Sequence, residues 1–160
     1  MNNDIIVREM RKDDKRHILD IIKKIKIFSD EDQRIATELV EEILVGPNTE
    51  EYYVLCAIKE DKILGYICFG PASLCIGTYD IYYIAVDPQY FRNGVGKFLI
   101  SSTEDYIKEK KGRLILIETS SNEEYYGTRN FYLKLGYNEI ARIKDYYKMN
   151  EDKIIYEKRV

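Results

Sequence analysis

A buried strand that runs into a glycine-bearing turn and then a helix is the sequence feature that most constrains the fold. Residues 80–88 read DIYYIAVDP, and residues 89–97 read QYFRNGVGK. The first segment is apolar and β-branched up to a proline, and the second carries Gly94 and Gly96 where a helix would begin. Backbone amides at such a helix start attract phosphate groups. The sequence therefore predicts a site for a phosphate-bearing cofactor at this turn.

The whole chain has the composition of one folded domain. It has 160 residues, of which 45% are apolar, and it contains neither a long uninterrupted apolar run nor a Pro/Gly/Ser-rich linker. We therefore expect a single domain over residues 1–160, without a membrane segment. Charged residues interrupt the first apolar stretch and no cleavage site follows it, which favours a cytoplasmic location.

Charge and residue counts argue against several classes of function. The net charge is −3 with both signs interspersed, so we expect neither nucleic acid nor an anionic membrane as a partner. His17 is the only histidine, and Cys56, Cys68 and Cys75 lack metal-binding spacing. We expect no metal, no disulfide framework and no cysteine or serine nucleophile.

Hydrophobic periodicity and turn signals predict the order β-α-α-β-β-β-α-β-α-β-β. The fold class is therefore α/β or α+β with a mixed sheet. The expected strands cover residues 4–8, 52–59, 63–69, 79–86, 114–117, 137–143 and 153–158, and the expected helices cover 13–28, a segment from Ser29 to a stop at Gly46-Pro47, 95–111 and 125–135.

Three of these segments carry more detailed predictions. Helix 13–28 buries a stripe formed by Ile18, Ile21, Ile22, Ile25 and Phe28, and the next helix, capped by Ser29 and Asp32, carries the stripe Ile35, Leu39 and Ile43. Residues 114–117 are continuously apolar, which predicts a strand covered on both faces.

The element order, the strand-turn-helix and the segment RNFYLKLGY at 129–137 together resemble the GNAT superfamily of acetyl-CoA-dependent N-acyltransferases. The resemblance extends over nearly the whole chain. The family's pyrophosphate turn, [Q/R]-x-x-G-x-[G/A], falls on residues 91–96, and its aromatic-Tyr-x-x-x-Gly-aromatic signature falls on residues 131–137. The resemblance implies a mixed, mainly antiparallel sheet whose parallel central strands splay around acetyl-CoA.

The resemblance also implies the cofactor site. The pantetheine arm would pair with the backbone of Ile84, Ala85 and Val86 as an added strand does, and the diphosphate would bind Arg92, Asn93, Gly94, Val95, Gly96 and Lys97, with Lys134 as a further contact. One position departs from the family pattern, because Phe91 stands where Gln or Arg is usual. We expect Arg92 to supply the missing charge.

Acetyl transfer to an amine needs a base, because an alkylamine is mostly ammonium at neutral pH, and it needs an acid for the departing thiolate. By resemblance, Asp80 is the expected general base or ammonium anchor, with Glu118 in reserve. Asp80 and Val86 share a sheet face only if no bulge intervenes, and we expect a bulge. Tyr132 is the expected acid, since a phenol with a pKa of about 10 is protonated at neutral pH.

The acceptor is predicted to be a small cationic amine, bound by aromatic and acidic residues. The expected substrate residues are Glu118, Tyr125, Thr128 and Tyr146. Transfer would be direct, in a ternary complex. Two alternatives stay open, namely acetylation of a protein amino terminus or lysine, and a non-catalytic CoA-binding regulatory domain. A homodimer is also left open.

Overall fold

The protein forms one mixed sheet flanked by helices, as the sequence predicts. The computed structural model describes residues 4–45 and 51–160. Its elements are β1 (Ile6–Glu9), α1 (Lys15–Lys24), α2 (Asp30–Val45), β2 (Tyr53–Lys59), β3 (Lys62–Pro71), β4 (Thr78–Val86), α3 (Val95–Glu109), β5 (Leu114–Ser120), α4 (Tyr126–Lys134), β6 (Asn138–Lys148) and β7 (Glu151–Arg159), with short 3-10 turns η1 (Lys12–Asp14), η2 (Pro88–Tyr90) and η3 (Glu123–Tyr125). This order is the predicted one.

The sheet has seven strands in the order β1-β2-β3-β4-β5-β7-β6. All neighbours are antiparallel except β4 and β5, which are parallel. The predicted fold class, an α+β fold with a mixed and mostly antiparallel sheet, is confirmed.

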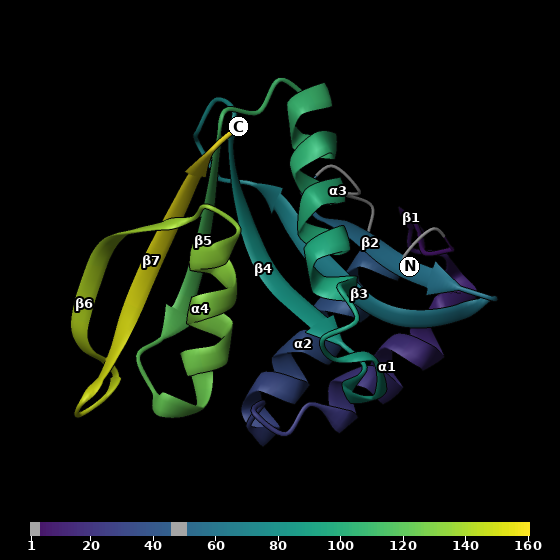
Figure 1. The fold of residues 1–160 in the computed structure, drawn as a ribbon, viewed down its shortest axis with the longest axis horizontal. Helices are drawn as coiled ribbons and strands as arrows, with labels where there is room; N and C mark the ends of the chain where they lie inside the picture. Colours follow the sequence, from purple (N-terminus) through teal and green to yellow (C-terminus); the bar gives the residue numbers. More distant parts are fainter. Residues whose placement is uncertain (1–3, 46–50) are drawn as a thin grey trace.

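The two parallel strands separate halfway along their length. β4 and β5 pair only where Thr78–Ile81 lies beside Leu114–Ile117. Beyond that point β4 continues to Val86 and β5 to Ser120, and Figure 1 shows the two strands diverging. The predicted splay is therefore present, and it leaves one edge of residues 82–86 without a strand partner among the described residues.

A bulge lies in β4 at Tyr82. Opposite it on β3, Cys68 pairs with Tyr83 and Phe69 pairs with Ile81, so Tyr82 is the additional residue. The bulge that the sequence predicts is confirmed.

The bulge changes which side chains share a face. Ile81 lies in the core under α3, and so do Ile84 and Val86, while Ala85 lies in the core under α1 and α2. Because side chains alternate along a strand, Asp80 points to the α1 and α2 side, away from the face of Ile84 and Val86.

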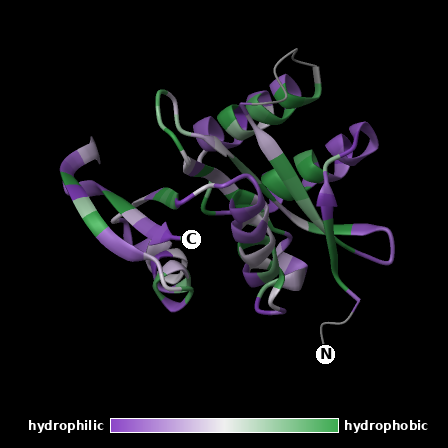
Figure 2. Ribbon diagram, turned by 90° about the horizontal axis from the view of Figure 1, so that it is seen from above, coloured by the Kyte–Doolittle hydropathy of each residue, from purple (hydrophilic) through white to green (hydrophobic). Residues whose placement is uncertain are grey.

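The helices form two layers of different extent. α3 and α4 pack on one face, over a core that takes residues from β2 through β5 and from β7. α1 and α2 pack on the other face, where the core draws its strand residues from β2, β3 and β4 alone. Figure 2 shows these helices set apart from the β6 and β7 end of the sheet. No helix in the described part of the chain is long and apolar enough to cross a membrane.

The first two helices match the predictions in part. Ile18, Ile21, Ile22 and Ile25 are buried as predicted. The helix ends at Lys24 instead of residue 28, because Ile25 has an extended backbone.

The cap at the start of α2 is confirmed. The Ser29 amide donates to the Asp32 carboxylate at 2.9 Å, and the Asp32 amide donates to Ser29 Oγ at 3.1 Å. The predicted stripe of α2 is confirmed in part, since Leu39 and Ile43 pack against the core, whereas Ile35 is 41% exposed and Ala36 and Val40 are the fully buried residues. The predicted stop at Gly46-Pro47 lies outside the described residues.

The predicted cover on both faces of β5 is also wrong. Ile115 and Ile117 are buried, whereas Leu116 on the opposite face is half-buried. The reason is that the core under α1 and α2 stops at β4. β6 also runs beyond its expected end at residue 143, to Lys148, and all eleven of its residues are exposed.

Candidate active site

The turn between β4 and α3 has an unusual backbone. Asp87 follows β4 and its carboxylate accepts a hydrogen bond from the Gln89 amide at 3.1 Å, which starts η2. Arg92 has a φ of 63° and Gly94 a φ of 79°, so two residues adopt the left-handed conformation just before α3. Glycine takes that conformation without strain, whereas Arg92 does not.

Backbone amides at this turn point out of the helix start. The first hydrogen bond of α3 runs from the Phe98 amide to the Gly94 carbonyl at 3.0 Å. Among the described residues, the amides of residues 94–97 have no backbone acceptor. The Asn93 amide already donates to the Tyr90 carbonyl at 3.3 Å, so the set of donors for an anion is one residue shorter than the sequence suggests.

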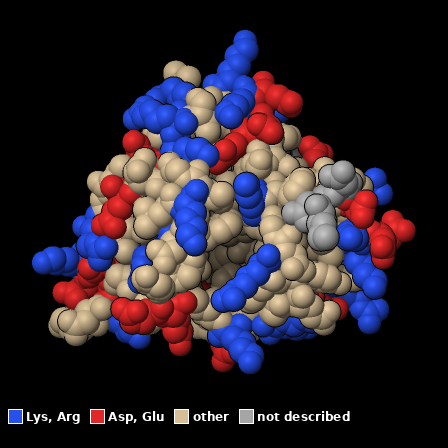
Figure 3. Space-filling model, in the orientation of Figure 1, with Lys and Arg blue, Asp and Glu red and all other residues tan. Residues whose placement is uncertain are grey.

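Gly96 lets two helices approach each other beside this turn. A Cβ atom at position 96 would lie 3.1 Å from Cζ of Phe131 in α4. Because Gly96 has no side chain, the ring of Phe131 can lie close to the helix start that carries the amides of residues 94–97. Figure 3 shows a hollow between α3 and α4 that is flanked by Lys and Arg side chains.

The predicted charged contacts of the cofactor lie at the surface near this turn and on α4. Arg92, Lys97 and Lys134 are exposed. Phe91 is 56% exposed, so the residue that departs from the family pattern faces solvent. Ile84 and Val86 are half-buried at the edge that the splay opens, and Ala85 is buried on the opposite face.

Asp80 has the environment of a base. It is half-buried, and no ion pair or hydrogen bond joins its carboxylate to another described residue. Burial raises the pKa of Asp80, and the negative charge of Glu118 raises it further. A carboxylate in this state gains more from accepting a proton than one that is paired with a cation.

Glu118, the reserve base, is neutralised instead. Lys153 Nζ lies 2.6 Å from its carboxylate, and the same ammonium lies 4.0 Å from the ring centroid of Tyr146. Two of the predicted substrate residues therefore share one cation. Lys153 was missed by the sequence reasoning, because only the register of β5 with β7 brings it beside Glu118.

Tyr132 is buried in the core and its ring is held by other aromatic rings. The centroid distances are 5.5 Å to Phe131 and 6.1 Å to both Tyr137 and Tyr156. Burial raises the pKa of Tyr132 above its usual value, so the phenol keeps its proton at neutral pH. Within the described residues its hydroxyl has no hydrogen-bond partner, which leaves it able to donate to a bound group.

Aromatic and acidic side chains from four elements form one cluster, which comprises Asp32 in α2, Tyr83 in β4, Tyr125 in η3 and Tyr147 in β6. Burial raises the pKa of Tyr83 in β4, and the nearby Asp32 and Tyr147 raise it further. Burial likewise raises the pKa of Tyr125 in η3 to about 12, with the same two neighbours contributing. The sequence predicts Tyr125 as a substrate residue and Asp32 only as a helix cap. Thr128 is half-buried and has no polar contact within the described chain.

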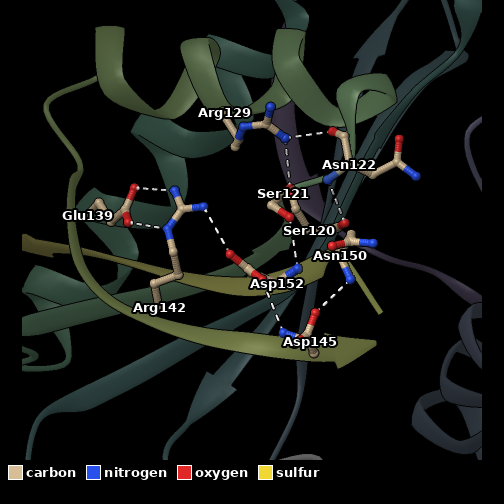
Figure 4. Close-up of polar contacts among 9 residues, drawn as sticks. All are labelled: Ser120, Ser121, Asn122, Arg129, Glu139, Arg142, Asp145, Asn150 and Asp152. Carbon is tan, nitrogen blue, oxygen red and sulfur yellow. Dashed lines mark hydrogen bonds and ion pairs between the residues drawn. The ribbon is translucent and has the colours of Figure 1, made fainter. Parts of the chain in front are cut away.

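Arg129 holds the start of α4 against the end of β5 (Figure 4). Its guanidinium donates to the Ser120 carbonyl at 2.8 Å and to the Asn122 carbonyl at 2.7 Å. Ser120 Oγ in turn donates to Glu151 at 2.6 Å. The arginine of the RNFY segment therefore fixes the turn that carries Tyr125.

A second set of polar contacts stiffens the β6–β7 hairpin (Figure 4). Arg142 pairs with Glu139 at 3.0 Å and with Asp152 at 3.3 Å. Asp152 also accepts the Asp145 amide at 3.1 Å, and Asp145 accepts the Asn150 amide at 2.6 Å. These bonds position the segment that carries Tyr146 and Tyr147.

Metal and thiol chemistry find no support in the described residues. No group of His, Cys, Asp or Glu side chains among them could hold a metal ion. Cys56 and Cys68 are buried, and burial raises the pKa of each thiol to about 12. Cys75 is exposed in the loop before β4.

Comparison with known proteins identifies the family. The profile of the acetyltransferase (GNAT) domain matches residues 49–139. A crystal structure from Desulfovibrio desulfuricans, assigned to the GNAT acetyltransferase family, is 32% identical with a TM-score of 0.92, over 97% of this chain and 98% of that chain. No functionally curated protein matches the sequence.

Two more distant structures share the fold. An aminoglycoside 6′-N-acetyltransferase in complex with coenzyme A is 18% identical, with a TM-score of 0.75 over 96% of both chains. The ribosomal-protein-S18-alanine N-acetyltransferase from Escherichia coli is 19% identical, with a TM-score of 0.77 over 98% of this chain and 94% of that chain. The prediction of an acetyl-CoA-dependent N-acetyltransferase is confirmed at the level of the family. The splayed sheet, the glycine turn and the match over residues 49–139 agree, and this chain belongs to the GNAT family of acetyltransferases.

Proposed function

We propose that the protein acetylates a small cationic amine by direct transfer from acetyl-CoA within a ternary complex. The observation that carries this proposal is the half-buried carboxylate of Asp80 beside the opening between β4 and β5, which no other described residue pairs with. A base in this position can take the proton of an ammonium whose nitrogen must attack the thioester. Burial raises the pKa of the Cys56 and Cys68 thiols, so neither is activated as a nucleophile, which supports direct transfer.

The described residues fit acetyl-CoA. The amides of residues 94–97 and the left-handed Gly94 offer a cradle for the diphosphate, and Arg92, Lys97 and Lys134 offer positive charge near it. The open edge of residues 84–86 can receive the amides of the pantetheine arm as an added strand. Acetyl-CoA supplies the acetyl group as a thioester.

Three groups of the chain then have separate roles. Asp80 accepts the ammonium proton, directly or through water, and thereby exposes the nitrogen lone pair. A backbone amide near Val86 donates to the carbonyl oxygen as negative charge develops on it. The Tyr132 hydroxyl donates a hydrogen bond or proton to the departing sulfur, since burial keeps the phenol protonated.

The acceptor site favours a cationic amine. Tyr83, Tyr125 and Asp32 converge from three different elements, and aromatic faces with carboxylates attract ammonium groups. The aminoglycoside acetyltransferase of the same fold acts on a molecule of this kind. We therefore propose aminoglycosides and polyamines as the first acceptors to test. The competing acceptor is a protein amino terminus, because the S18-alanine acetyltransferase has the same fold.

An acceptor panel with acetyl-CoA tests the proposal through release of free thiol. The assay should use a Cys75→Ser background, because the exposed Cys75 thiol would itself react with a disulfide reagent. We expect turnover with aminoglycosides or polyamines and none with peptides. Turnover with peptide amino termini alone would contradict the small-molecule acceptor, and no thiol release with any amine would contradict catalysis.

Asp80→Asn and Glu118→Gln form a matched pair of variants for the base. Both replace a carboxylate by its isosteric amide on the same face of the sheet. We expect Asp80→Asn to lower kcat by about 10²-fold or more and Glu118→Gln to have a far smaller effect, because Lys153 already neutralises Glu118. The reverse order would assign the base to Glu118.

A further inference from the structure

The ammonium of Lys153, near the start of β7, lies between side chains of the two strands that flank β7. It is 2.6 Å from the Glu118 carboxylate of β5 and 4.0 Å from the ring centroid of Tyr146 of β6. The Lys153 side chain is only 13% exposed, although lysine is seldom buried without a partner. A carboxylate and an aromatic face are the groups that hold a cation away from water. Lys153 is therefore a fixed charge of this site.

The strand register places Lys153, Glu118 and Asp80 on one face of the sheet. Asp80 pairs with Leu116 across the parallel strands β4 and β5, and Glu118 comes two residues later in β5, so its side chain points to the same side. Lys153 pairs with Ser120, which comes two residues after Glu118. Three charged side chains from β4, β5 and β7 therefore follow one another across this face.

Glu118 is the link between the other two charged residues. Burial raises the pKa of Asp80, and the negative charge of Glu118 raises it further. Burial lowers the pKa of Lys153, but its hydrogen bonds with Glu118 and Tyr146 more than offset this and raise the pKa overall, so Lys153 stays charged. Its positive charge opposes the negative charge of Glu118, because a contacting pair of opposite charges acts on a third group far less than either charge alone.

The other titratable groups of this region are neutral or face other residues. Tyr82 in β4 faces Asp80, and burial raises the pKa of Tyr82 to about 12. Tyr147 in β6 faces Glu118, and burial raises its pKa as well. Four acidic residues face these tyrosines or the neighbouring Tyr52, Tyr83 and Tyr125, namely Asp32 and Glu42 in α2, Glu51 before β2 and Glu151 in β7. Because Glu118 is the charged group that acts on Asp80, the partner of Glu118 decides how strongly it acts.

We propose that Lys153 is a positioning residue for the general base, because its pairing with Glu118 offsets the negative charge beside Asp80 and keeps Asp80 ionised at neutral pH. This inference deepens the proposed function and rests on the role of Asp80 given there. The same pairing occupies Glu118 and Tyr146, two groups that would otherwise attract the ammonium of the acceptor away from Asp80. Lys153 thereby also directs the acceptor to the carboxylate that takes its proton.

A pH titration of the Asp80 carboxyl group by carbon-13 NMR tests the proposal without turnover, with Asp80→Asn to assign the signal. Lys153→Met removes the charge and leaves Glu118, which is 53% exposed, without its cation. We expect the Asp80 midpoint to move to higher pH. Adding Glu118→Gln to Lys153→Met should bring the midpoint back down. The matched control is Lys148→Met, which removes a lysine of the same hairpin that pairs with Glu151 and should leave the midpoint unchanged.

The pH dependence of kcat/KM gives a second readout. Its acid limb should move to higher pH in Lys153→Met, with a several-fold loss of kcat/KM below the wild-type midpoint and a smaller loss at high pH. An Asp80 midpoint that is unchanged or lower in Lys153→Met, one that Glu118→Gln fails to lower, or an equal shift in Lys148→Met would overturn the role of Lys153. A shifted midpoint in a protein that acetylates no amine would confirm the charge compensation and overturn the proposed function instead.

Discussion

The ammonium of Lys24, the last residue of α1, lies 2.6 Å from the carboxylate of Asp87, the residue that follows β4. Asp87 is buried and its carboxylate also caps η2 through the Gln89 amide. One ion pair therefore ties the helix layer on the acceptor side to the turn that is proposed to hold the diphosphate. The Asp87 carboxylate therefore contacts both the end of α1, through Lys24, and the start of η2, through the Gln89 amide.

Loss of this ion pair should weaken cofactor binding. Lys24→Met leaves the buried Asp87 carboxylate without its cation, so the turn should lose its fixed geometry. We expect a several-fold rise in the KM for acetyl-CoA with little change in kcat. Lys23→Met is the control, since Lys23 precedes Lys24 and makes no ion pair within the described chain. Equal KM values in both variants would contradict a role for the pair.

Gly96→Ala tests the close approach of α3 and α4. The new Cβ would lie 3.1 Å from Phe131, so the ring or the helix must shift beside the cradle. We expect calorimetry to give a several-fold larger dissociation constant for coenzyme A. Gly127→Ala in α4 meets nothing within 4 Å. It should leave binding unchanged and raise the free energy of unfolding by up to about 1 kcal/mol. Unaltered binding by Gly96→Ala would contradict the cradle.

Tyr132→Phe separates the hydroxyl from the ring. The ring keeps its packing against three aromatic neighbours, so the fold should persist, whereas the proposed proton donor is lost. We expect kcat to fall by about 10²-fold or more and the dissociation constant for coenzyme A to stay within a few-fold. Tyr156→Phe removes a hydroxyl from the same cluster and should retain activity. Full activity of Tyr132→Phe would remove this residue from catalysis.

A buried polar cluster ties α3 to the end of α4 and to β7. The Tyr137 hydroxyl donates to Glu104 at 3.1 Å, and Lys158 donates to the same carboxylate at 2.8 Å. Tyr137→Phe should lower the free energy of unfolding by about 1–3 kcal/mol, because the bond reaches a charged acceptor. Urea denaturation checks this, and Tyr156→Phe, whose hydroxyl has no partner among the described residues, should cost less. Equal losses would contradict the contribution of the bond.

Much of the fold follows from local patterns. The period of Ile18, Ile21, Ile22 and Ile25 fixes α1, and the pair Ser29 and Asp32 fixes the start of α2. Periodicity fails where two stripes compete. Helix α2 carries both Ile35-Leu39-Ile43 and Ala36-Val40. Tertiary packing buries the smaller pair fully, buries Leu39 and Ile43 in part and leaves Ile35 exposed.

The electrostatics of the site could not be predicted in the same way. Lys153 neutralises Glu118 only because β7 pairs with β5 in one register, and Lys24 reaches Asp87 across 63 residues of sequence. Both contacts depend on long-range placement that no local pattern encodes. The resemblance of the sequence to a known family predicts Asp80 and Tyr132 as catalytic candidates. The structure adds that burial raises the pKa of Asp80, whereas Glu118 is paired with Lys153.

The pH dependence of kcat/KM for the best acceptor, in the wild type, Asp80→Asn and Glu118→Gln, tests the central claim most directly. Asp80 must be ionised to accept a proton, so the wild-type rate should fall as pH drops through its raised pKa. Glu118→Gln should move this fall to lower pH, because the charge of Glu118 contributes to the raised pKa. Asp80→Asn should lose both the rate and this limb of the profile. If Asp80→Asn kept the wild-type value of kcat/KM and its wild-type pH dependence, the assignment of Asp80 as the base would be contradicted.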